Sequence, residues 1–235
     1  MPDKNIIVTI DGPAGAGKST TARRVAERLG YVYIDTGAMY RAVTLAALRE
    51  GTTITDDALQ TLLRHTDIRL VHTVGGQRTY LNGIDVSEAI RSADVTNLVS
   101  TISAMPVVRR AMVSMQRSMG ASGGVVMDGR DIGSVVFPSA EVKVFLVADL
   151  DERIRRRASE AHLNGQQLTL DQVRHQIVER DRIDSERSDS PLVRPDGAAE
   201  IDTTNLTIDE QVDRIVTLAR KYLSAYNLIS GYGNL

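Results

Sequence analysis

The chain of 235 residues has no cysteine and only four histidines. The lack of cysteine excludes disulfide bonds and thiolate-bound metal. The histidines are far apart, and none has a partner at a spacing typical of a metal site. They stand at His65, His72, His162 and His175. We therefore expect neither a disulfide framework nor a metal centre built on cysteine or histidine.

An excess of one charge is also missing. Lys and Arg total 28 against 30 Asp and Glu, so the formal net charge is −2. Domains that bind bulk nucleic acid are usually strongly basic. We therefore expect no nucleic-acid polymer as a partner. Local groups of arginine could still bind a small anion.

Long apolar runs are absent as well. The apolar stretch nearest the start, Ile6 to Ile10, is only as long as a strand, and the segment before it is short and polar. A membrane helix needs about 20 apolar residues, and a secretory signal needs an apolar region of about 7–15 residues behind a basic start. The sequence predicts a cytoplasmic protein with no membrane partner. With 42% hydrophobic and 25% charged residues, it has an ordinary globular composition.

The first fifty residues alternate between strand and helix patterns. A β-branched run from Asn5 to Ile10 leads straight into a glycine-rich turn, which is typical of a buried parallel strand. Residues 18–29 have helical apolar spacing that stops at Gly30. A short strand over 31–34 and a helix over 37–49 follow. This alternation predicts an α/β fold.

The middle of the chain breaks that alternation. Short strand patterns over 68–72, 78–81 and 84–86 are separated by glycine-containing turns, which predicts a small antiparallel meander and hence an insertion. The next expected element is a helical stretch over 95–119 that is broken or restarted at Pro106. Strands are expected over 124–128, 142–147 and 200–202, and two charged helices between 151 and 187. A helix over 209–222, capped by Thr207 with Glu210, and a fraying tail over 224–235 complete the chain.

A phosphate-binding motif lies between the first strand and the first helix. Residues Gly12 to Ser19 satisfy G-x-x-x-x-G-K-[ST] in full. Such a loop directs backbone N–H groups and a helix N-terminus at phosphate oxygens. Lys18 would then bridge the β- and γ-phosphates of ATP, and Ser19 would offer its hydroxyl to Mg²⁺. The expected ATP-binding residues are Gly12, Pro13, Ala14, Gly15, Ala16, Gly17, Lys18, Ser19 and Thr20. A glycine-rich turn that binds nothing is the weaker alternative.

The motif alone does not identify the reaction, because ATPases, GTPases and small-molecule kinases share it. No Asn-Lys-x-Asp guanine signature follows it. No long ATPase-type core follows it either. The chain length fits a small-molecule kinase.

Polar residues follow two further strands at the edge where α/β sheets bind ligands. After the second strand, Thr36 can cap a helix, with Tyr40 and Arg41 about one turn later. By itself, a capped helix with a solvated arginine would be the stronger interpretation. After the third buried strand comes Asp128-Gly129-Arg130-Asp131. Asp128 is placed for a magnesium-side carboxylate, and Arg130 and Asp131 would point into the crevice; a turn with a solvated ion pair is the alternative.

A strongly charged stretch lies between residues 151 and 187. It carries two groups of arginines and carboxylates: Arg153, Arg156 and Arg157, then Arg180, Asp181, Arg182, Asp184 and Arg187. A run of this kind is usually a solvated helix face. It could equally be a mobile arm that closes over the transferred phosphoryl group and excludes water. The residues alone leave both interpretations open.

These motifs together resemble the bacterial cytidylate kinase family, from about Ile6 to Leu223. The most specific segments are residues 10–18, 35–41 and 128–138. The resemblance implies one α/β domain over 1–235, a P-loop kinase core with a five-stranded parallel sheet flanked by helices. Its parts would be a core over 1–60, 91–150 and 198–223, an antiparallel nucleotide-binding insertion over about 61–90, an arginine-rich helical lid over about 151–190, and a tail over 224–235.

The resemblance also implies a reaction, the transfer of a phosphoryl group from ATP with Mg²⁺ to CMP or dCMP by a monomeric enzyme. The implied CMP-binding residues are Thr36, Tyr40, Arg41, Ser100, Arg109, Arg130, Asp131, Asp184 and Arg187. Residue 36 is threonine where related chains often carry serine, and both keep a hydroxyl. The neighbouring Arg110 leaves the assignment of Arg109 ambiguous by one position.

Roles follow from the same resemblance. Arg41, Arg109 and Arg130 would bind the acceptor phosphate, while Asp131 and Ser100 would read the cytosine edge. The sugar hydroxyls would fall to Asp184 with Arg187. The implied catalytic residues are Lys18, Arg130, Arg153, Arg157 and Arg180, and the implied metal-side residues are Ser19 and Asp128. Two alternatives stay open, a kinase for another acceptor such as shikimate and an ATP-gated switch that binds nucleotide without transfer.

Overall fold

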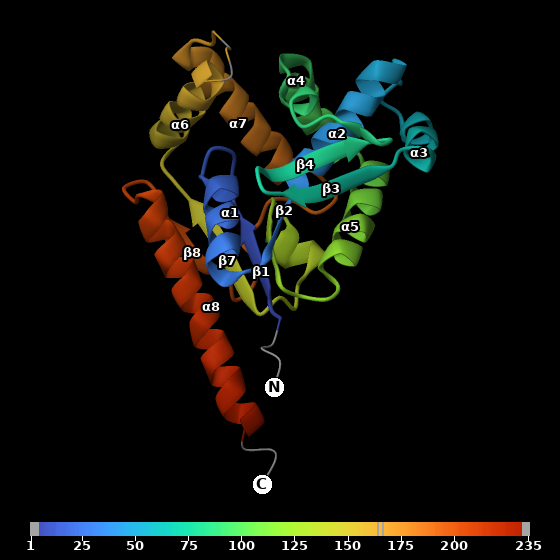
Figure 1. Ribbon diagram of the computed structural model, residues 1–235. Helices are drawn as coiled ribbons and strands as arrows, with labels where there is room; N and C mark the ends of the chain where they lie inside the picture. Colours follow the sequence, from blue (N-terminus) through green and yellow to red (C-terminus); the bar gives the residue numbers. More distant parts are fainter. Residues whose placement is uncertain (1–4, 164, 166, 232–235) are drawn as a thin grey trace.

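Two sheets of opposite type organise the chain, as the computed structural model shows for residues 5–163, 165 and 167–231 (Figure 1). The larger sheet is all parallel, with strand order β2-β6-β1-β7-β8. Its strands are β1 (Ile7–Asp11), β2 (Val32–Asp35), β6 (Val125–Asp128), β7 (Val142–Val147) and β8 (Ala199–Asp202). This confirms the expected five-stranded parallel sheet. Because the strands run the same way, the carboxyl ends of β1, β2 and β6 meet at one edge.

Helices cover both faces of the parallel sheet. On one face, α1 (Lys18–Leu29) and α8 (Ile208–Gly231) pack on the strands through residues such as Val25 and Ile215, which are fully buried. On the other face, α5 (Pro106–Gly120) and the short π-helix η2 (Ile132–Val136) cover Ile34 and Met127. Pro106 begins α5, which confirms the expected new helix start.

The last helix is longer than the sequence predicts. The tail from residue 224 was expected to fray, but α8 continues to Gly231 (Figure 1). The segment 224–230 contains neither proline nor glycine, so nothing in it stops the helix. The part of the predicted tail from 232 to 235 lies outside the described residues. The predicted cap is present, because the Thr207 Oγ1 accepts a bond from Glu210 N at 3.3 Å.

The smaller sheet is the predicted antiparallel meander. It contains β3 (Ile68–Thr73), β4 (Gly76–Leu81) and β5 (Ile84–Asp85) in that order. Its first turn is tighter than expected, with two connecting residues in place of five. Gly76 allows this because its φ of 105° is open to glycine and strained for other residues.

The meander shares one hydrophobic core with the helices around it. These are α2 (Thr36–Glu50), α3 (Asp56–Arg64), the 3-10 helix η1 (Ala89–Arg91), α4 (Ala93–Ala104) and α5. Fully or almost fully buried side chains of this core include Met39, Leu59 and Ile102. Helix α3 is not predicted from the sequence, although its N-cap Thr55 accepts a bond from Ala58 N at 3.4 Å.

The arginine-rich stretch forms two helices, α6 (Leu150–Leu163) and α7 (Leu170–Glu186). They pack on each other through a small apolar cluster that includes Ile154, Val173 and Ile177. The two helices stand above α1 and the sheet edge, and α7 also contacts α4 (Figure 1). None of the described helices combines the length and the apolar character needed to cross a membrane.

Candidate active site

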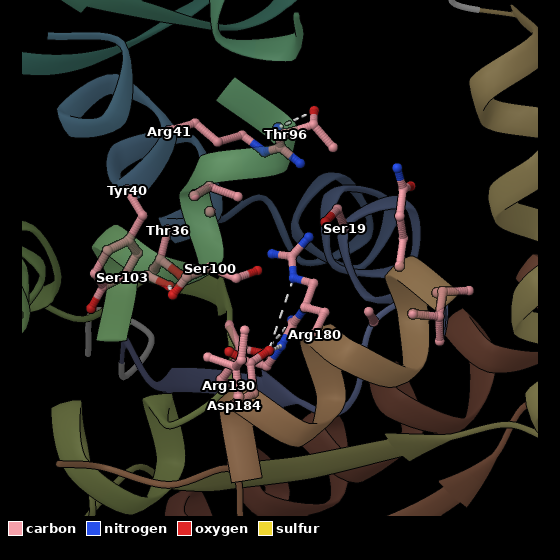
Figure 2. A pocket seen from close by; sticks show the side chains of 18 of the residues that line it. Ser19, Thr36, Tyr40, Arg41, Thr96, Ser100, Ser103, Arg130, Arg180 and Asp184 are labelled. Carbon is pink, nitrogen blue, oxygen red and sulfur yellow. Dashed lines mark hydrogen bonds and ion pairs between the residues drawn. The ribbon is translucent and has the colours of Figure 1, made fainter. Parts of the chain in front are cut away.

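A cavity of about 470 Å³ opens at the carboxyl edge of the parallel sheet, between α2 and α4 on one side and α6 and α7 on the other (Figure 2). Most of the residues predicted from the sequence line it: Ala14, Gly15, Lys18, Ser19, Thr36, Tyr40, Arg41, Ser100, Arg109, Asp128, Arg130, Asp131, Arg157, Arg180, Asp184 and Arg187. Segments that are more than 150 positions apart in the sequence therefore share one compartment.

Six predicted residues do not line this cavity: Gly12, Pro13, Ala16, Gly17, Thr20 and Arg153. The glycines among them shape the loop. At Gly12, a Cβ atom would lie 2.1 Å from the backbone oxygen of Leu146, so only glycine fits beside β7. Gly17 is the N-cap of α1 and has a φ of 90°. The motif thus contains residues that shape the loop and residues that face the cavity.

Lys18 lies beneath the phosphate-binding loop. Its Nζ donates to the backbone oxygen of Pro13 at 2.6 Å, and its side chain is almost fully buried. Burial lowers the pKa of Lys18 well below its usual value, and the nearby Arg130 lowers it further. An anionic phosphate in the cavity would therefore favour the charged form of this lysine.

Asp128 is hydrogen-bonded on both carboxylate oxygens. The Ser19 hydroxyl donates to Oδ2 at 2.8 Å and the Tyr33 hydroxyl donates to Oδ1 at 2.9 Å. Burial, followed by the neighbouring Asp35, raises the pKa of Asp128 to about 6. Tyr33 is not predicted from the sequence, because a tyrosine in a short strand pattern is more often a core residue.

The oxygen atoms of Ser19 and Asp128 suit Mg²⁺. This ion prefers oxygen ligands and is commonly held by one or two protein groups together with substrate phosphates. Among the described residues, no group of three or more His, Cys, Asp or Glu side chains is placed to hold a metal. The residues therefore fit a magnesium ion that arrives with a nucleotide.

The start of α2 differs from the prediction. Thr36 was expected to cap this helix, but the cap is Asp35, whose carboxylate accepts from Ala38 N at 2.9 Å. A carboxylate is preferred there because it also offsets the helix dipole. Thr36 instead donates its hydroxyl to the backbone oxygen of Asp128 at 2.7 Å, and so joins α2 to the end of β6.

Arg41 is not solvated. It lines the cavity, and its guanidinium donates to the Thr96 hydroxyl at 3.0 Å and to the Ile90 backbone oxygen at 3.3 Å (Figure 2). Burial, followed by repulsion from Arg157, lowers its pKa to about 10. The alternative of a solvated arginine at this position is therefore wrong. Thr96 was missed, since no sequence pattern marks it.

Asp131 is a buried carboxylate between two arginines. Its Oδ2 forms an ion pair with Arg109, and its Oδ1 lies 3.4 Å from a terminal nitrogen of Arg187. The Arg109 side chain is 2% exposed, whereas the next residue, Arg110, is exposed and does not line the cavity. Of the two neighbouring arginines, Arg109 is therefore the one that a ligand in the cavity could contact.

Asp184 joins three more pairs. Its Oδ2 lies 2.7 Å from Nε of Arg130 and 3.9 Å from Nε of Arg180, and its Oδ1 lies 3.5 Å from Arg187 (Figure 2). Burial alone would raise the pKa of Asp184, but Arg130 and Arg180 outweigh it and hold the pKa below its usual value. The carboxylate is therefore ionised near neutral pH.

The network carries surplus positive charge. Its four arginines, Arg109, Arg130, Arg180 and Arg187, face two carboxylates, Asp131 and Asp184, so two positive charges are unbalanced. Within the described part of the chain, one buried nitrogen on each of Arg109, Arg180 and Arg187 lacks a well-aligned hydrogen-bond acceptor, although that of Arg187 is in ion-pair range of Asp131. Unpaired buried donors are costly. Charge and free donors together suit a phosphate dianion.

The two predicted lid arginines of α6 point in different ways. Arg157 lines the cavity, where it pairs with Glu160 at 2.8 Å. Arg153 lies outside it and donates to backbone oxygens of Ala148 at 3.1 Å and Ala14 at 3.2 Å. In this structure, Arg153 therefore contacts the protein backbone and not the cavity.

The cavity contains a P-loop at a helix N-terminus, a serine–carboxylate pair and a cationic second compartment. Together these features are typical of a P-loop kinase that acts on a small anionic acceptor. The comparisons make the class narrower. A family model described as cytidylate kinase matches residues 8–221. The cytidylate kinase of Anoxybacillus flavithermus is 51% identical over 220 residues, which cover 93% of this chain and 98% of the relative. That of Bacillus subtilis is 50% identical over 215 residues, covering 91% and 96%.

The chain belongs to the cytidylate kinase family. It is therefore an enzyme, a nucleoside monophosphate kinase, and the alternative of an ATP-gated switch falls away. Among solved structures, a shikimate kinase from Acinetobacter baumannii aligns over 93% of this chain and 95% of its own, with 14% identity and a TM-score of 0.48. That likeness says nothing about the acceptor.

Proposed function

We propose that this enzyme transfers the γ-phosphoryl group of ATP, with Mg²⁺, to CMP or dCMP, and releases ADP and the corresponding diphosphate. The observation that carries the proposal is the pair of compartments in one cavity. One is the phosphate-binding loop, and the other is the arginine network with two unbalanced positive charges. A donor triphosphate and an acceptor monophosphate would meet between them.

The donor half is built from the loop and α1. Backbone N–H groups of the loop and the N-terminus of α1 would hold the phosphates. Lys18 would exchange its bond to Pro13 for the β- and γ-phosphates, whose negative charge would raise its pKa again. Ser19 and Asp128 would hold Mg²⁺. When bound, Mg²⁺ would neutralise negative charge on the nucleotide phosphates.

The acceptor half would read both ends of the nucleotide. Arg41, Arg109 and Arg130 would bind its phosphate. Asp131 and Ser100 would face the base, where a carboxylate can accept from the exocyclic amine of cytosine and uracil has no such donor. Asp131 is already paired with Arg109, but a carboxylate has about four acceptor positions and can take a further bond.

Side chains of α7 and α6 would bind the sugar and the transferred phosphoryl group. Asp184 and Arg187 would bind the sugar hydroxyls, and Arg157 and Arg180 would neutralise the charge of the phosphoryl group during its transfer. No general base is needed, since the attacking phosphate oxygen is already an anion. Catalysis would consist of positioning and charge stabilisation for an in-line attack. An α6–α7 lid would keep water from the γ-phosphate.

An acceptor panel tests the proposal. ADP release would be followed with ATP, Mg²⁺ and, in turn, CMP, dCMP, UMP, AMP, GMP and shikimate. We expect fast release with CMP and dCMP and little with UMP. Release with a different acceptor would keep the kinase chemistry and discard the roles of Asp131 and Ser100. No acceptor-dependent release would overturn the proposal.

We propose further that the enzyme is a cytoplasmic monomer that acts on free nucleotides. The balance of 28 basic and 30 acidic residues supports small nucleotides over nucleic-acid polymers as partners. Light scattering of the purified full chain, with and without ATP, tests the monomer. A mass of two chains or more would contradict it.

A further inference from the structure

Helix α7 contacts the phosphate-binding loop from outside the cavity. The Asp181 Oδ1 accepts from Ala14 N at 3.1 Å, and its Oδ2 forms an ion pair with Arg153. The same Arg153 donates to the backbone oxygen of Ala14 at 3.2 Å. Both backbone polar groups of one loop residue are therefore held by two side chains that also hold each other. We call Asp181 and Arg153 the loop clamp.

The loop clamp is fixed from a third direction and closely packed. The Nε of Arg153 donates to the Ala148 backbone oxygen at 3.1 Å, where the chain leaves β7. A Cβ atom built on Gly15 would lie 3.0 Å from the Arg153 Cβ, so the arginine lies directly against the loop. The side chains of Arg153 and Asp181 are 12% and 21% exposed, unlike a solvated surface pair.

The position of the clamp on α7 connects the two halves of the cavity. Asp181 directly follows Arg180, which lines the cavity beside Asp184, while Asp181 itself does not line it. Adjacent helix residues point about 100° apart, so one turn of α7 faces the cavity and the loop at once. The conformation of Ala14 and Gly15 and the placement of Arg180 are thereby tied to each other.

We propose that Asp181 is a positioning residue which, with Arg153, holds the Ala14–Gly15 backbone in its phosphate-binding conformation and keeps Arg180 over the transferred group. The inference rests on the proposed function. For Arg153, it replaces the direct phosphate contact that the family resemblance implies. Loss of the clamp would weaken ATP binding, slow transfer and admit water to the γ-phosphate.

The test compares three changes in the full chain. Asp181→Ala removes the clamp, and we expect about a tenfold or greater rise in the Kd of a non-hydrolysable ATP analogue, since a charge-assisted contact to the loop is lost. Asp181→Asn keeps an oxygen for Ala14 N but loses the ion pair, so its effect should be intermediate. Asp151→Asn is the matched control, because Asp151 also joins α6 to α7, through Arg174 at 2.7 Å, but is 84% exposed and away from the cavity. It should behave as wild type.

Two further readouts separate positioning from general loosening. The ratio of ATP hydrolysis without acceptor to transfer with CMP should rise in Asp181→Ala, while the KM for CMP changes less than the KM for ATP. A double-mutant cycle combines Asp181→Ala with Arg153→Ala. The double variant should bind the ATP analogue no more weakly than the poorer single variant, because each single change already removes the loop clamp. Equal rises in both KM values together with a lowered Tm would overturn the proposal.

A folded Asp181→Ala variant with wild-type analogue Kd and wild-type hydrolysis ratio would also overturn it. If that variant does not fold, Asp181→Asn and the Arg153→Lys variant decide by the same readouts. The Kd is measured without any acceptor. A wild-type enzyme inactive on CMP would therefore end the proposed function and leave the clamp to be judged on binding alone.

Discussion

The two halves of the cavity would hold phosphate by different means. The donor half is a run of eight consecutive residues, Gly12 to Ser19, whose backbone would do most of the phosphate binding. The acceptor half is made of side chains from several separate elements, among them Arg41 on α2, Arg109 on α5 and Asp184 on α7. A backbone site depends on local conformation. A side-chain site depends on the whole fold and on the carboxylates that keep its arginines buried.

The largest effect should come from the one side chain on which the donor half depends. Lys18→Ala removes the charge that would follow the γ-phosphate into the transition state. We expect kcat to fall by a few orders of magnitude, as for a loss of about 3–5 kcal/mol. Stability should be unchanged or slightly higher, because a buried cation with a lowered pKa disappears. Near-normal turnover by the folded variant would end the assignment.

The acceptor half should respond to loss of a carboxylate in stability as well as in rate. Asp184→Ala leaves the mostly buried Arg130 and Arg187 and the partly exposed Arg180 without their shared partner. Breaking a buried pair of this kind costs about 3–5 kcal/mol of unfolding free energy. Urea denaturation measures it. Glu186→Ala on the same helix is the control, because its pair with Arg182 is exposed and should contribute nothing measurable.

The pH dependence of that loss has a definite sign. The pKa of Asp184 is lower in the folded chain than in the unfolded one. Its stabilisation is therefore present above the unfolded value of about 4 and is lost as the pH falls through the folded value. In acid, wild type and Asp184→Ala should converge. A difference that stays constant down to acid unfolding would mean that packing, not charge, explains the effect.

The contrast between the halves also explains what the sequence could predict. The donor loop is contiguous, so its motif and flanking elements identify it at once. The acceptor residues are dispersed, and only the family resemblance assigned Ser100 and Arg109 to the site. Thr96 and Tyr33 act through single hydrogen bonds to residues far away in the sequence, to Arg41 and to Asp128. No periodicity or spacing encodes such bonds.

The fold likewise has features that follow from local sequence patterns and features that distant contacts decide. The parallel strands, the meander and the break at Pro106 follow from local patterns, and the structure confirms them. The cap of α2 does not, because Asp35 and Thr36 are both good capping residues and only the bond of Thr36 to Asp128 decides between them. The charge run of α7 was ambiguous for a similar reason. It has a solvated face with Arg182 and a buried face with Asp184.

A smaller effect should appear in the pH profile of the donor half. The pKa of Asp128, at about 6, means that its carboxyl is neutral below that pH and cannot attract Mg²⁺. Lys18, Ser19, Tyr33 and Asp35 all face it. We expect kcat/KM for ATP with Mg²⁺ to rise with pH through an inflection near 6. Because the pKa of Asp128 is raised in the folded chain, its contribution lowers the free energy of unfolding as the pH rises from about 4 to about 6. The contribution of Asp184 has the opposite sign.

Tyr33→Phe sharpens that assignment. The tyrosine hydroxyl stabilises the ionised form of Asp128, so its removal should move the inflection to higher pH. Plateau activity above the inflection should change little. An inflection that does not move in Tyr33→Phe would assign the titration to another group.

The smallest effect should come from a position that supports α7 but touches neither half of the cavity. Thr169 and Gln172 form a reciprocal capping box, with bonds of 2.8 and 3.2 Å between side chain and backbone. Thr169→Ala should lower stability by about 1 kcal/mol. Asp181 and Asp184 lie about three to four turns further on, so the KM values for ATP and CMP should stay at wild-type levels. A change in either KM as large as that from Asp181→Ala would mean that the whole helix, and not the contacts of single residues, sets the geometry of the cavity.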